Sequence, residues 1–130
     1  MEKELLNTFD KELLLKDICA RLPYGVIALT EKGKGHICDI NLTIFGTKIG
    51  ININPTVRDT FSVEDIKPYL FPLSSMTEEQ EKEYNNLNCY ELGCFPHSEE
   101  ALDYLTKNHF DYRYLIEKGL ALDATGKNVY

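Results

Sequence analysis

Two runs of alternating apolar and polar residues, joined by a short glycine turn, constrain the fold of this chain most. The first run spans residues 36–45 and the second spans residues 49–54. Successive side chains of a strand point to opposite faces, so the two runs predict a β-hairpin with one aliphatic face. The apolar set of that face is Ile40, Leu42 and Ile44 in the first run and Ile49, Ile51 and Ile53 in the second.

Further strands are expected on both sides of this hairpin. Residues 24–30 form a short apolar run that a polar double-glycine turn closes, and residues 57–63 can add a fourth strand. The result is a small antiparallel sheet. It can either curl into an SH3-like barrel or remain a flatter β-meander packed on a helix, and the sequence leaves both alternatives open.

Helical patterns flank the β-rich region. Residues 2–22 carry apolar side chains at three- to five-residue steps, which predicts an amphipathic helix ending before Pro23. Residues 63–73 predict a turn of helix followed by an extended segment. Thr77 and Gln80 form a capping box that starts a polar surface helix reaching about Leu87.

Two more short helices are expected after a loop over residues 88–97. Ser98 can cap the first of them, whose buried stripe would be Ala101, Leu102 and Leu105. Asp111 can cap the second, over residues 112–118, with Gly119 as its left-handed terminator. The chain therefore predicts one α+β domain over residues 1–130. Its parts are an N-terminal helix (1–23), a β-rich core (24–73) and a helical segment with a tail (74–130).

The charge balance and the N-terminus restrict location and partners. Fourteen basic and 21 acidic residues give a net charge of −7, which disfavours free nucleic acid and anionic membrane as partners. The first residues have neither the basic region nor the apolar stretch of a signal peptide, so a cytoplasmic protein is expected. In that reducing compartment the four cysteines are expected to be free thiols.

One group of residues has the donor atoms of a zinc site. Cys89, Cys94, His97 and His109 would supply two thiolates and two imidazoles, which is a complete tetrahedral set. Their spacing lacks the two tight pairs of a typical structural site, and the alternative is a loop with two half-buried cysteines. No bound cofactor is predicted.

A second group could bind a small ligand or a nucleotide. His109, Asp111, Tyr112 and Arg113 place a base, an acid, a phenol and a guanidinium within five residues. The competing interpretation is structural, with Asp111 as a helix cap and with His109 and Arg113 facing water. His36 and Cys38 also share one face of a predicted strand, where a packed thiol beside an exposed histidine is the usual arrangement.

The leading functional expectation is a protein-interaction module without catalytic activity. The chain contains no phosphate-binding glycine loop, serine nucleophile elbow, His-Glu-x-x-His motif or paired Cys-x-x-Cys motif. Its eight tyrosines suit core edges or protein interfaces. The acidic balance favours a protein partner with a basic surface, and the module could be a monomer or a homodimer. A small-ligand protein and a zinc-stapled structural module are the alternatives.

Three stretches carry a resemblance to known proteins: LKDICARLPYGV at residues 15–26, VEDIKPYLFPLSSMTEE at 63–79 and HFDYRYLIEKGLAL at 109–122. Together they resemble a set of small uncharacterised proteins from Bacteroidales genomes and from the phages and mobile elements of those bacteria. The resemblance implies a cytoplasmic accessory protein of a bacterium or its phage. It implies no activity, cofactor or catalytic residue.

Overall fold

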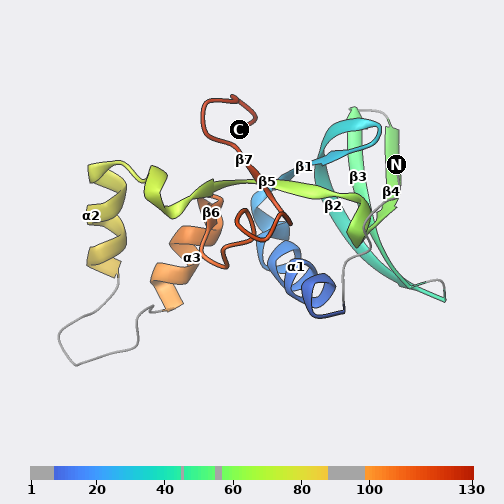
Figure 1. The fold of residues 1–130 in the computed structure, drawn as a ribbon, viewed down its shortest axis with the longest axis horizontal. Coiled ribbons are helices and arrows are strands. Elements are labelled where there is room, and N and C mark those ends of the chain that lie inside the picture. Colours follow the sequence, from blue (N-terminus) through green and yellow to red (C-terminus); the bar gives the residue numbers. More distant parts are fainter. Residues whose placement is uncertain (1–7, 45, 55–56, 88–98) are drawn as a thin grey trace.

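The computed structural model describes residues 8–44, 46–54, 57–87 and 99–130. A sheet of several antiparallel strands forms one end of the molecule, and two short helices lie at the other end (Figure 1). One strand, β5, runs between the two ends, and the first helix lies beneath it. The α+β fold expected from the sequence is confirmed.

Within the described residues the sheet has seven strands, six of them in the order β4-β3-β2-β1-β5-β6, and β7 also pairs with β5. Strands β1 to β5 pair antiparallel, whereas β6 and β7 run parallel to β5. The bounds of the strands are β1 (Ile27–Thr30), β2 (Gly33–Thr43), β3 (Gly46–Asn54), β4 (Val57–Ser62), β5 (Lys67–Pro72), β6 (Phe110–Asp111) and β7 (Leu122–Asp123).

Strands β1 to β4 follow the predicted meander closely. Register shifts between Ile37 and Asp39 and between Asn52 and Asn54 mark irregularities of the kind that bends a sheet. The five antiparallel strands place β4 and β5 at opposite ends of their path, and no pairing joins those two strands within the described ranges. These five strands therefore form an open meander rather than a closed barrel.

The described residues form three α-helices and three 3₁₀ turns. The bounds are α1 (Thr8–Arg21), α2 (Glu78–Leu87) and α3 (Glu99–Lys107), with 3₁₀ turns η1 (Leu22–Tyr24), η2 (Val63–Asp65) and η3 (Leu73–Ser75). The capping box is confirmed, because the Thr77 amide donates to Gln80 Oε1 at 2.9 Å and the Gln80 amide donates to Thr77 Oγ1 at 3.2 Å. The cap expected at Ser98 lies outside the described residues. No described helix has the length and apolar content to cross a bilayer.

The core lies between α1 and the sheet. Leu14 and Ile18 of α1 are fully buried and belong to one apolar cluster with Ile49 and Ile51 of β3 and Leu70 of β5. Burying side chains of this size contributes about 1.5–3 kcal/mol each. The predicted aliphatic face of β3 is therefore the face that packs on the helix.

The aliphatic face predicted for β2 is only partly correct. Ile40 is half-buried, but Leu42 is 86% exposed and Ile44 is 93% exposed. The β2–β3 hairpin extends past the described part of α1, and no described element covers its outer residues (Figure 1). Strand alternation is retained there, but the burial that usually accompanies it is not.

The helix predicted over residues 112–118 is wrong. This segment forms consecutive turns, and Tyr114 has a φ of 57°, which a right-handed helix cannot contain. The Asp111 carboxylate still caps the segment, but its oxygens accept from the amides of Leu115 and Ile116, each at 2.9 Å. The prediction that Gly119 is left-handed is confirmed by its φ of 75°.

Candidate functional site

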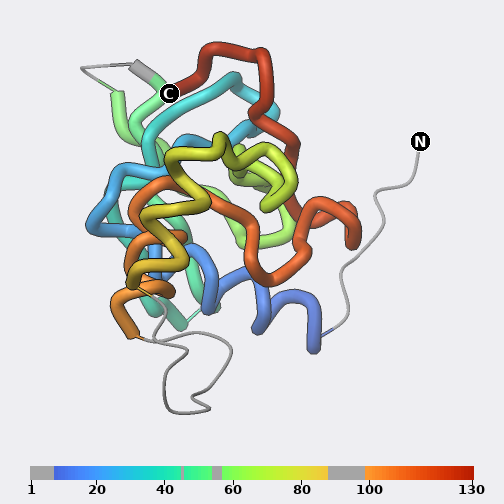
Figure 2. Tube along the Cα trace, turned by 90° about the vertical axis from the view of Figure 1, so that its left-hand side faces the viewer, coloured from blue at the N-terminus to red at the C-terminus, as the bar shows by residue number. Residues whose placement is uncertain are grey.

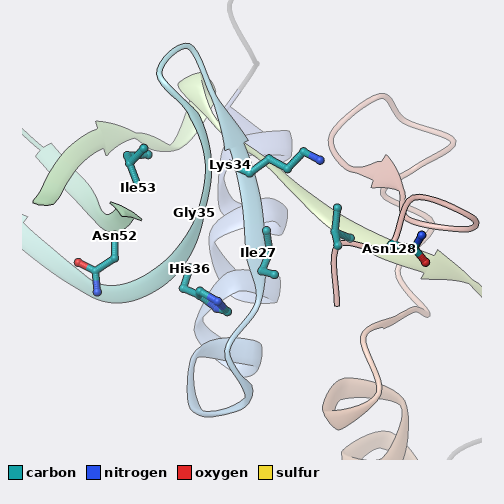
Figure 3. Close-up of a pocket in the computed structure, with 8 residues that line it drawn as sticks. Ile27, Lys34, Gly35, His36, Asn52, Ile53 and Asn128 are labelled. Carbon is teal, nitrogen blue, oxygen red and sulfur yellow. The ribbon is translucent and has the colours of Figure 1, made fainter. Parts of the chain in front are cut away.

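A groove of about 440 Å³ opens between strands β1 to β3 and the C-terminal tail (Figure 3). Its floor is aliphatic, with Ile27 from β1, Ile53 from β3 and Val129 from the tail. The tail passes close to the strands of the β-rich end, as Figure 2 shows. Segments about a hundred residues apart in the chain therefore form one concave site.

Four polar side chains surround this floor: Lys34 and His36 on β2, Asn52 on β3 and Asn128 on the tail. Residues 34 and 36 share one face of β2, since successive strand residues alternate. His36 pairs with Asn52 of β3, so the Asn52 side chain lies on the same face of the sheet as Lys34 and His36. In Figure 3 the Lys34 side chain extends toward the tail segment that carries Asn128.

Gly35 sets the close approach of β2 and β3 beside the groove. A Cβ atom at this position would lie 2.4 Å from the carbonyl oxygen of Asn52 and 2.6 Å from Cγ2 of Ile51. Real Cβ atoms do not come that close to backbone atoms, so only glycine fits without displacing β3.

The electrostatics of the rim differ from those of the rest of the acidic surface. Lys34 Nζ lies 5.6 Å from the centroid of the Tyr69 ring, within the range of a cation–π contact. Across the described ranges, neither Lys34 nor His36 forms a salt bridge. The basic side chains that do have acidic partners are Lys11, Arg21, Lys32, Arg58 and Arg113.

The Tyr130 hydroxyl anchors the tail wall of the groove. It accepts a hydrogen bond from the Ile27 amide at 2.9 Å and donates to the Tyr69 carbonyl at 2.7 Å. The last β1–β5 pair on this side is Ala28 with Pro68, so the phenol bridges the two strands where their direct pairing stops. Burial raises the pKa of Tyr130 to about 12, and the hydroxyl therefore stays protonated at neutral pH.

A second cavity, of about 380 Å³, lies beyond the tail and contains the predicted ligand residue His109. Phe71, Phe110 and Tyr130 also line it, and the His109 ring stacks on Tyr130 with centroids 3.9 Å apart. The His109 Nδ1 atom is buried without a hydrogen-bond partner among the described atoms. Desolvation, with a smaller effect of the nearby Arg21 cation, lowers the pKa of His109 to about 4.

This shift predicts a specific loss of stability in acid. The folded state holds His109 neutral, so as pH falls below about 6.5 the unfolded chain takes up a proton that the folded chain does not. Because the ring is partly exposed, we expect the loss of unfolding free energy between pH 7 and pH 5 to be about 1 kcal/mol larger in the wild type than in His109→Asn. Asparagine suits the φ of 63° at this position. Urea titrations at both pH values measure the difference, and equal losses in the two proteins would contradict it.

The other members of the predicted ligand group, Asp111, Tyr112 and Arg113, form contacts with neighbouring parts of the chain. Arg113 donates to Asp17 at 2.7 Å, and Asp17 also accepts from Arg21 at 2.8 Å. The Tyr112 ring lies 4.6 Å from the Arg113 guanidinium and 5.4 Å from that of Arg21. With Asp111 acting as a cap, His109 is the member of the group that faces a cavity.

The Asp17–Arg21 pair was not predicted, although both side chains are fully buried. An acid and a base four residues apart on the helix stripe that carries Leu14 and Ile18 were the available signal. Arg21 also donates to the carbonyl of Phe110, which ties α1 to β6.

Three residues of the predicted zinc set, Cys89, Cys94 and His97, lie outside the described residues. Among those described, no cluster of three or more His, Cys, Asp or Glu side chains could hold a metal ion. Cys38 is a free thiol that donates to the Gly50 carbonyl at 3.2 Å, and burial raises its pKa.

Comparisons with protein-family models, with curated proteins and with solved structures give no match. Neither the fold nor the groove therefore receives an activity by similarity. The resemblance to proteins of Bacteroidales and their phages stays an expectation from the sequence.

Proposed function

We propose that this chain is a protein-interaction module without catalytic activity. The observation that supports the proposal best is the apolar end of the β2–β3 hairpin, where Leu42 is 86% exposed and Ile44 is 93% exposed. Neighbouring large apolar side chains at such exposure are typical of a surface that a partner covers.

Pairing between β2 and β3 holds the described part of the hairpin next to these side chains. Leu42 pairs with Thr47, and the Thr43 hydroxyl donates to the Gly46 carbonyl at 2.8 Å. The inner half of the hairpin is fixed in the core by Ile49 and Ile51. A partner that buries both exposed side chains would gain about 1.5–3 kcal/mol from each.

Charge and context complete the proposal. A net charge of −7 favours encounter with a partner that has a basic surface, and it disfavours direct binding of nucleic acid. The sequence resemblance favours an accessory role in a bacterium or in one of its phages or mobile elements. On this proposal the module acts in the cytoplasm, as a monomer or homodimer.

Replacing Leu42 and Ile44 together with serine is expected to abolish partner capture without unfolding the protein. The measurement is capture from a host lysate at low salt, with cross-linking and mass spectrometry to place the contacts on the bait. Tyr114→Ser is the matched control, since Tyr114 is also exposed, at 55%, but lies away from the hairpin in the turns after β6.

The control should retain the partners of the wild type. Capture of the same proteins by the double serine variant, or cross-links that avoid the hairpin, would contradict the proposal. Sedimentation of the wild type alone shows whether a second copy is the partner, and in that case the double variant should be monomeric.

A further inference from the structure

We propose that the groove between strands β1 to β3 and the tail binds a small organic anion with an aliphatic body. This is a second binding property, separate from the hairpin surface. The anionic head, a carboxylate or a phosphate, would lie against Lys34, and the body would cover Ile27, Ile53 and Val129.

The size and shape of the groove suit a small molecule. Its volume of about 440 Å³ falls within the usual range for ligand pockets, about 300–1,000 Å³. An apolar floor with a few polar groups at the rim is the common composition of such pockets, in which the floor supplies affinity and the rim fixes orientation.

The charged side chain at the rim of the groove favours an anionic ligand. The lining includes Lys34 but no aspartate or glutamate, although the protein as a whole is acidic. Lys34 has no acidic partner within the described ranges, so a ligand anion would not have to displace one. The side chains of Asn52 and Asn128 and the His36 ring form no hydrogen bond to any described residue, and each can donate to the same head group.

The apolar side chains of the floor favour a ligand with an aliphatic body. Its side chains are isoleucine and valine, and His36 supplies the single ring that lines the groove. Stacking of a nucleobase normally uses one or more aromatic planes, whereas branched aliphatic side chains suit an alkyl chain. The groove therefore favours an aliphatic anion over a nucleotide.

The test uses four probes with matched parts. Octanoate and octyl phosphate combine an aliphatic body with an anionic head, octylamine carries the same body with a cation, and acetate has the head without the body. Each is added below its micelle-forming concentration to ¹⁵N-labelled protein, and the amide resonances of Gly35, His36, Ile53 and Val129 are followed. We expect saturable shifts with octanoate or octyl phosphate, at least tenfold weaker binding of octylamine, and no saturation with acetate.

The Lys34→Met variant tests the head-group contact directly. Lys34 is exposed, so the variant should fold, and we expect its affinity for the tighter anionic probe to fall about tenfold or more. Lys67→Met is the matched control, because Lys67 is an exposed lysine of β5 that does not line the groove, and it should bind as the wild type does.

The two anionic probes identify the head group, since the tighter one shows whether carboxylate or phosphate is preferred. Equal binding of octylamine, unchanged affinity in Lys34→Met, or shifts confined to residues outside the groove would each overturn the proposal. None of these outcomes bears on the hairpin surface, which the serine variants test separately.

Discussion

Replacing Asp17 with alanine is expected to lower the free energy of unfolding by about 3–5 kcal/mol. Asp17 is fully buried and accepts from two guanidinium groups, those of Arg21 at 2.8 Å and Arg113 at 2.7 Å. Removing the carboxylate would leave the fully buried Arg21 cation without its counter-charge. Urea denaturation followed by circular dichroism measures the change.

A double variant separates the lost charge pair from lost packing. Asp17→Leu combined with Arg21→Met removes both fully buried charges and fills similar volume, while Arg113, whose side chain is 16% exposed, keeps some contact with solvent. We expect this variant to recover most of the stability lost in Asp17→Ala, because apolar replacements of buried ion pairs are often neutral or stabilising. A loss below about 1 kcal/mol in Asp17→Ala would contradict the assigned role of this carboxylate.

Adding one methyl group at Gly35 is expected to cost about 3 kcal/mol, at the upper end of typical overpacking penalties. The Cβ of Gly35→Ala would meet the Asn52 carbonyl oxygen at 2.4 Å and Ile51 Cγ2 at 2.6 Å. A backbone oxygen of a paired strand cannot move without breaking the β2–β3 ladder. Thermal unfolding of the variant measures the loss.

Gly50→Ala is the matched control on the opposite strand of the same hairpin. Its Cβ would approach the Asp39 carboxylate and the Arg58 guanidinium, the nearest contact being 2.4 Å. Both groups are the ends of flexible, partly exposed side chains whose surface ion pair contributes about 0–1 kcal/mol. We therefore expect a loss of about 1 kcal/mol or less. Equal losses at the two glycines would contradict this account.

The parts of the fold that depend on local chemistry were predictable. Strands β2 and β3 follow from two-residue alternation, and α2 begins at the reciprocal contacts of Thr77 and Gln80. The exposure of Leu42 and Ile44 was not predictable, because it depends on which elements pack against the outer part of the hairpin. The helix predicted after Asp111 is replaced by turns, and the left-handed conformation of Tyr114 had no signal in the sequence.

The candidate site was less predictable because distant segments form it. Lys34 and His36 lie more than 90 residues before Asn128, and no spacing rule connects them. Strand β6 has two residues, too few for a periodic signal, yet its pairing with β5 places His109 in the second cavity. The group at residues 109–113 was recognised from its composition, but the contact between Arg113 and Asp17 joins residues 96 apart in the sequence, and no spacing rule predicts it.

At one end of the β1–β5 pairing, the Tyr130 side chain links the two strands by hydrogen bonds of the kind that backbone groups form elsewhere in the sheet. Ladder hydrogen bonds form between groups that almost every amino acid has, so they tolerate most substitutions. The bridge from the Ile27 amide to the Tyr69 carbonyl instead passes through the Tyr130 phenol, 103 residues from Ile27 and 61 from Tyr69. Phenylalanine at position 130 would keep the ring and remove the bridge. The direct β1–β5 pairing at Ala28 and Pro68 would remain, but its extension toward the tail depends on one side-chain oxygen rather than on backbone groups.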